Sequence, residues 1–133
     1  MSCRHVLTIL AVKELPRAVK FYAQAFGWRQ TVDTLVYAEF ELPDGMRLGL
    51  YERESFGVNT GQVPFAIPKG ALSGIELYFH SDDLERDSER LTTAGAKQLA
   101  ELQTKDWGDE AAYFADPEGN VIVLARKLEQ RAL

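Results

Sequence analysis

The strongest constraint on this 133-residue chain is an internal repeat. The segment PDGMRLGL at residues 43–50 returns as PEGNVIVL at residues 117–124. An amphipathic run from Leu15 to Gly27 returns in the same way as a run from Leu84 to Gly95. Two copies of one supersecondary unit predict a fold with pseudo-twofold symmetry, and we expect the chemistry of such a fold in the cleft between the copies.

The first copy begins with an apolar segment, residues 6–12, that predicts a buried strand. A helix is expected to follow from Leu15, with Pro16 in its first turn and Gly27 at its end. Residues 36–42 alternate between apolar and polar side chains, which predicts a second strand. A Pro-Asp-Gly turn then leads into a returning strand at residues 47–51.

The second copy repeats this order. Its first strand is predicted at residues 75–79, followed by a helix that Asp82 or Asp83 caps. Strands are predicted at 113–115 and 120–125, and only weakly at 97–102. The chain is therefore predicted to be one α+β domain of two βαβββ modules, residues 4–52 and 74–126, whose curved mixed sheet forms a cleft. A long connector, residues 53–73, joins the modules; it is rich in Gly, Pro, Asn and Gln.

Composition excludes several classes of function. The net charge is −5 and no basic run is present, so no nucleic-acid partner is expected. No apolar run approaches the roughly 20 residues of a membrane helix, and the N-terminus has no secretion signal. The single cysteine, Cys3, fits a reducing compartment. We therefore expect a cytoplasmic protein with no membrane partner.

Three stretches carry a resemblance to a known family. They are LPRAVKFY at 15–22 leading into FGW at 26–28, WG at 107–108 with YF at 113–114, and DPEGN at 116–120. In this order they resemble the vicinal oxygen chelate superfamily, which includes glyoxalase I, bleomycin-resistance proteins and extradiol dioxygenases. The first and third stretches are similar to its glyoxalase-like or bleomycin-resistance-like members. The resemblance implies a homodimer.

The superfamily's enzymes hold a divalent metal ion at four positions, two in each copy. The resemblance places these positions at Leu7, Gly49, Glu76 and Val123. Glu76 alone among them carries a metal-donor atom, so we expect no metal site and no cofactor. Glu76 and His80 cannot share one ion in straight strand geometry, because residues four apart on a strand are about 13 Å apart. His5 could join Glu76 only if the strand shifted by two residues.

The predicted binding residues are Arg47, Tyr51, Glu76, Tyr78 and Trp107. Glu76 is also the candidate catalytic residue, because partial burial would raise the pKa of its carboxyl group and make it a general base. The alternatives for Glu76 are an ion pair with Arg47 or simple exposure to water. Trp107 is predicted at the pocket rim, with packing against the connector as its alternative.

Three functions remain open from the sequence. The first is a metal-independent protein that binds a small amphiphilic metabolite or drug in the cleft. The second is a glyoxalase-like lyase or isomerase that uses Glu76 as base or an atypical metal site. The third is a structural or regulatory dimer whose cleft has lost its function.

Overall fold

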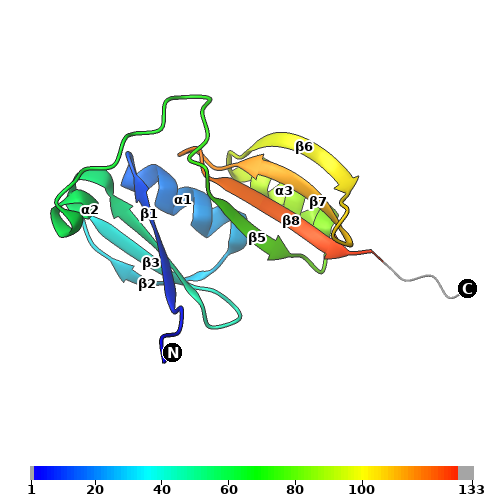
Figure 1. Ribbon diagram of the computed structural model, residues 1–133, viewed down its shortest axis with the longest axis horizontal. Helices are drawn as coiled ribbons and strands as arrows, with labels where there is room; N and C mark the ends of the chain where they lie inside the picture. Colours follow the sequence, from blue (N-terminus) through cyan, green and yellow to red (C-terminus); the bar gives the residue numbers. More distant parts are fainter. Residues whose placement is uncertain (1, 129–133) are drawn as a thin grey trace, which may run out of the picture. The chain divides into compact units, whose positions relative to one another are not determined.

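The computed structural model describes residues 2–128, which form two compact units that meet in sequence between Ala66 and Ile67 (Figure 1). That boundary falls inside the predicted connector, residues 53–73. Within the described residues the fold is α+β, with two four-stranded mixed sheets and three helices. None of these helices is long and apolar enough to cross a membrane.

The first unit holds one complete module. Its elements are β1 (Leu7–Val12), α1 (Leu15–Phe26), β2 (Arg29–Asp33), β3 (Tyr37–Glu41), β4 (Arg47–Glu52) and α2 (Arg53–Thr60). The strand order is β1-β4-β3-β2. The first strand runs parallel to β4, and the remaining pairs are antiparallel.

The second unit repeats this plan. Its elements are β5 (Glu76–His80), α3 (Leu84–Ala94), β6 (Lys97–Thr104), β7 (Asp109–Ala115) and β8 (Val121–Lys127). The order β5-β8-β7-β6, with β5 parallel to β8, matches the first unit strand for strand. The predicted α+β class with two repeated modules is confirmed.

The amphipathic runs form the helices that cover the two sheets (Figure 1). Pro16 lies in the first turn of α1, and Gly27 ends the helix with a φ of 66°. The apolar face of α1 packs on β3 and β4, and Phe21 and Tyr22 are almost completely buried there. In the second unit Asp83, one of the two predicted caps, accepts a hydrogen bond from the Arg86 backbone N–H at 3.2 Å.

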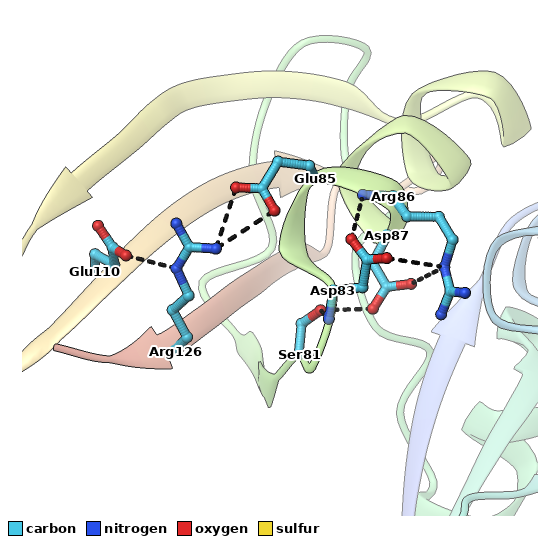
Figure 2. A network of polar contacts seen from close by, with 7 residues as sticks. All are labelled: Ser81, Asp83, Glu85, Arg86, Asp87, Glu110 and Arg126. Atoms are coloured by element: carbon cyan, nitrogen blue, oxygen red, sulfur yellow. Dashed lines mark hydrogen bonds and ion pairs between the residues drawn. The ribbon is translucent and has the colours of Figure 1, made fainter. Parts of the chain in front are cut away.

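A polar network ties α3 to its sheet (Figure 2). Arg126 on β8 donates to Glu110 on β7 and, at 3.1 Å, to Glu85 on α3. Arg86 lies 3.8 Å from both Asp83 and Asp87, so its contacts stay within the start of α3. Arg126 therefore connects β8, β7 and α3, whereas Arg86 contacts only residues at the start of α3.

Three elements differ from the prediction. The connector contains a helix, α2, which Glu52 caps by accepting from the Glu54 backbone N–H at 2.7 Å. The residue pattern does not predict α2, because this helix has only eight residues and contains Gly57, a poor helix former, in its interior. Strand β2 was not predicted and β6 only weakly. Both are edge strands that are exposed along most of their length, so neither shows clear apolar alternation.

Candidate functional site

A buried carboxylate organises the polar side chains of the second unit. Asp109 is the first residue of β7 and only 7% exposed. Its Oδ2 atom accepts a hydrogen bond from the Tyr78 hydroxyl at 2.6 Å and lies 3.2 Å from Nε2 of His80. Tyr78 and His80 are two residues apart on β5, so they share one face of the sheet.

Trp107 extends this cluster to the surface. Its Nε1–H donates to the Tyr78 hydroxyl oxygen at 2.9 Å, yet the residue is 57% exposed. The Nζ atom of Lys105 lies 5.8 Å from the Trp107 ring centre and 5.0 Å from that of Tyr113, within the range of cation–π attraction. The indole is thus exposed to solvent while a hydrogen bond holds its orientation.

The hydrogen bonds also set the protonation of the cluster. The bond from Tyr78 is the largest cause that lowers the pKa of Asp109, and His80 adds to it, while burial acts in the opposite direction. Burial raises the pKa of Tyr78, and its bond to Asp109 raises it further. At neutral pH Asp109 is therefore a carboxylate acceptor and Tyr78 a neutral donor.

Glu76 lies on the same face of β5 as Tyr78 but is exposed. Its negative charge raises the pKa of Tyr113, second to the effect of burial. Exposure leaves the expectation of a partly desolvated Glu76 without structural support, and its role as general base stays a prediction.

The first unit has its own buried carboxylate. Glu39 on β3 is 7% exposed, and its two oxygens accept from the Tyr37 hydroxyl at 2.6 Å and from Nη1 of Arg47 at 3.1 Å. Burial, followed by this bond to Glu39, raises the pKa of Tyr37. The sequence left open an ion pair between Arg47 and Glu76; in the structure Glu39 is the carboxylate that Arg47 contacts.

An aromatic group lies beside this pair. The Tyr37 ring is 5.0 Å from that of Tyr51, which meets Phe56 at 6.3 Å. Tyr37 also covers Gly49: a Cβ atom at Gly49 would lie 2.8 Å from Cε1 of Tyr37 and closer still to its hydroxyl oxygen. The ring therefore fills the space that a side chain at position 49 would need.

The residues at the four family metal positions do not fit a metal ion. Leu7, Gly49 and Val123 have no donor atom, and Tyr37 occupies the space in front of Gly49. The Tyr37 hydroxyl is no substitute, because its raised pKa keeps it protonated and it donates to Glu39. Within residues 2–128 no three His, Cys, Asp or Glu side chains are grouped so that they could hold a metal ion.

The structure brings together some of the predicted binding residues. Tyr78 and Trp107 are hydrogen-bonded in the second unit, and Arg47 and Tyr51 both lie near Tyr37 in the first. Asp109 is not among the predicted site residues, because the residue pattern predicts this strand only from Tyr113 onward. His80 ends β5 with its side chain 51% exposed, and the local residue pattern gives no sign of its contact with Asp109. The longer β7 is what makes Asp109 a buried residue.

Two repeated modules, each with a helix on a four-stranded mixed sheet, define a fold of the glyoxalase type. Residues 7–125 match the model of the Glyoxalase-like domain family. The chain belongs to this family and, with it, to the vicinal oxygen chelate superfamily.

One curated relative and several solved structures are similar to this chain. Uncharacterized protein YraH of Bacillus subtilis is 25% identical over 124 residues, which cover 90% of this chain and 94% of YraH. A glyoxalase-related enzyme from Fulvimarina pelagi matches with a TM-score of 0.82 and 19% identity, over 93% of this chain and 88% of that one. TioX from Micromonospora sp. ML1 matches with a TM-score of 0.66 and 24% identity, over 95% and 100% of the two chains. At these identities the solved structures show a shared fold.

Proposed function

We propose that this protein binds a small amphiphilic molecule without the help of a metal ion. The observation that carries the proposal is Trp107, an aromatic side chain that is 57% exposed but held by a hydrogen bond to Tyr78. A large apolar ring kept at the surface in a fixed orientation is a ready stacking surface for a ligand. The metal positions, three of which lack a donor atom, support metal independence.

The neighbouring groups indicate what such a ligand carries. Lys105 offers a cation beside the Trp107 ring, and Glu76 offers an exposed carboxylate on the face of β5 that bears Tyr78. Aromatic surface with charges of both signs suits a ligand with an apolar body and polar ends.

Tryptophan fluorescence tests this proposal directly. The chain has two tryptophans, and Trp28 stacks on Phe26 with ring centres 4.1 Å apart. Trp28→Phe therefore leaves Trp107 as the sole indole fluorophore. We expect saturable quenching by members of a panel of aromatic, cationic and thiol-conjugate compounds, retained in Trp28→Phe.

The matched variant is Trp107→Phe, in which the response should vanish although Trp28 still fluoresces. A quenching response that survives Trp107→Phe unchanged would refute this binding surface. Metal independence has its own test, elemental analysis of protein purified without chelator. A stoichiometric, tightly bound ion that is lost in Glu76→Ala would refute it.

Two further expectations remain, a homodimer from the family resemblance and a cytoplasmic location from the composition. We propose that the protein is a homodimer and that it works in the cytoplasm. Sedimentation equilibrium tests the homodimer: a mass of one 14.9 kDa chain would contradict it. The lyase or isomerase alternative built on Glu76 has less support, because the structure leaves that side chain exposed.

A further inference from the structure

We propose that His80, oriented by Asp109 and Tyr78, is a general acid–base catalyst for proton transfer on a small planar carbon acid. This inference rests on the proposed function, because the substrate would be held by stacking on Trp107. It assigns an activity to His80, with Asp109 as its partner, and both lie outside the four metal positions of the family.

The contact with Asp109 determines which nitrogen of His80 is basic. A carboxylate offers only acceptors, so the Nε2 atom at 3.2 Å from Oδ2 must carry a hydrogen. In the neutral imidazole the lone pair is then on Nδ1. The His80 side chain is 51% exposed, and Nδ1 makes no hydrogen bond to any residue of the described range 2–128. The basic nitrogen is thus free for a substrate.

Asp109 and Tyr78 are positioning residues in this arrangement. Asp109 is buried, so its carboxylate has little freedom to move, and it stabilises the imidazolium that forms when His80 takes a proton. Tyr78 holds Asp109 through its hydroxyl proton and accepts from Trp107. One side chain therefore connects the carboxylate that orients the base to the ring on which a substrate would stack.

The chemistry needs no cofactor or co-reactant. Nδ1 takes a proton from an acidic C–H bond of the substrate, and the electron pair of that bond stays on the substrate. The pair either forms an enolate that His80 reprotonates at another atom, or it expels a leaving group within the same molecule. Isomerisations and eliminations of this kind balance with one proton and one base.

Nitrobenzisoxazole is a suitable probe, because it is planar, aromatic and a carbon acid. Loss of its isoxazole C–H proton to Nδ1 forms a nitrile from the C–H electron pair and breaks the N–O bond, which releases a coloured phenolate. The imidazolium then returns its proton to water. We expect saturable turnover by the intact chain, faster than an equal concentration of imidazole, with kcat about 100-fold lower in His80→Gln.

The chain offers a matched control, since it contains two histidines. His5 lies in the other unit, where Nε2 is 3.1 Å from the Leu7 carbonyl oxygen, so His5→Gln should leave turnover unchanged. Asp109→Asn should lower kcat with little change in KM, because it disturbs the orientation of the base and not the stacking surface. Tyr78→Phe should also lower kcat, and it should raise KM as well, because the Tyr78 hydroxyl accepts from Trp107. This variant keeps the test usable if Asp109→Asn fails to fold.

Each outcome decides the proposal. Turnover that is equal in folded His80→Gln and in the unaltered chain overturns it, as does the absence of turnover. If the probe still quenches Trp107 in that case, ligand binding stands and only the catalytic role is lost. If it neither quenches nor turns over, both ideas fail for this ligand class. Nitrogen NMR of the imidazole rings adds a substrate-free check: a neutral His80 protonated on Nδ1 also overturns the proposal.

Discussion

At the residue scale, the ring of Tyr37 occupies the space that a side chain at Gly49 would need. Tyr37 lies over Gly49, donates to Glu39 and packs against Tyr51, so three contacts hold the ring in place. A side chain at position 49 cannot enter unless the ring leaves. The volume available to a side chain at position 49 is therefore limited by Tyr37, which lies on the neighbouring strand β3.

We expect Gly49→Ala to lower the free energy of unfolding by about 1–3 kcal/mol, the usual cost of forcing extra volume into a packed site. Urea denaturation measures this loss. In a Tyr37→Ala background the same substitution should cost much less, because the obstructing ring is gone. Equal losses in the two backgrounds would contradict the steric explanation.

Asp109 makes stability depend on pH, mainly through the hydrogen bond that it accepts from Tyr78. Its folded-state pKa is lowered, so the stabilisation is present above the ordinary carboxyl value of about 4 and is lost as the pH falls through the lower folded value. The Tyr78 hydroxyl is the main cause of that lowering. We expect Tyr78→Phe to reduce stability at pH 6 and to lose less stability than the unaltered chain on going to pH 2.

Urea titrations at the two pH values measure this prediction. Tyr113→Phe is the control, since burial and the charge of Glu76, without a bond to Asp109, raise the pKa of Tyr113. A parallel acid loss in Tyr78→Phe and in the unaltered chain would show that the Tyr78 bond does not set the titration of Asp109.

At the element scale, the two copies of the repeated turn differ in what surrounds them. Gly45 and Gly119 occupy the same place in the two turns and have φ values of 92° and 87°. A Cβ at Gly45 meets nothing within 4 Å, whereas at Gly119 it would lie 2.7 Å from the carbonyl oxygen of Ala71. The connector is also held to this second turn by the Ser73 hydroxyl, 2.7 Å from Oδ1 of Asn120.

Substitutions at Gly45 and Gly119 can therefore distinguish the cost of a strained backbone from the cost of a steric clash. We expect Gly45→Ala to cost about 1 kcal/mol for the left-handed backbone alone. Gly119→Ala should cost a further 1–3 kcal/mol, roughly, because the connector backbone must move. Thermal or urea unfolding of both variants checks the difference, and equal losses would rule out close packing of the connector on the second turn.

The Arg126 network in Figure 2 makes a second prediction at this scale. Arg126→Met should destabilise the protein more than Arg86→Met, because the first removes contacts that join α3, β7 and β8 while the second removes contacts within the start of one helix. Methionine keeps most of the apolar stem in both cases. Hydrogen exchange in α3 should rise in Arg126→Met; an increase confined to Arg86→Met would contradict this assignment.

At the scale of the whole molecule, the chain consists of two units with matching strand orders and a linking segment without regular structure from Gly61 to Ile75. Lys69 lies in that segment and is exposed. Segments of this kind are preferred sites of proteolysis. Brief treatment with trypsin should cut after Lys69 first, as mass spectrometry would show, and Lys69→Gln should remove that cut. Earlier cleavage inside a strand, such as after Lys97, would be the contrary result.

Much of this fold was predictable because its signals are local. The helix ends at Gly27 and Gly95, the cap at Asp83 and the two Pro-acidic-Gly turns all lie where the residue pattern predicted them. Strand β2 and helix α2 were not predicted, because neither segment has a clear periodic pattern of apolar residues. Their structure depends on neighbours that the local pattern does not reveal.

Residue identity and order are enough to show that the chain duplicates one module and that three of its four family metal positions lack a donor atom. They do not show which polar groups meet, because those contacts form only when the strands pair. Strand pairing brings Asp109 to Tyr78 and His80, about thirty positions earlier in the chain, and sets Tyr37 over Gly49. Register and burial control such contacts, because they fix which side chains share a face and which lose their water.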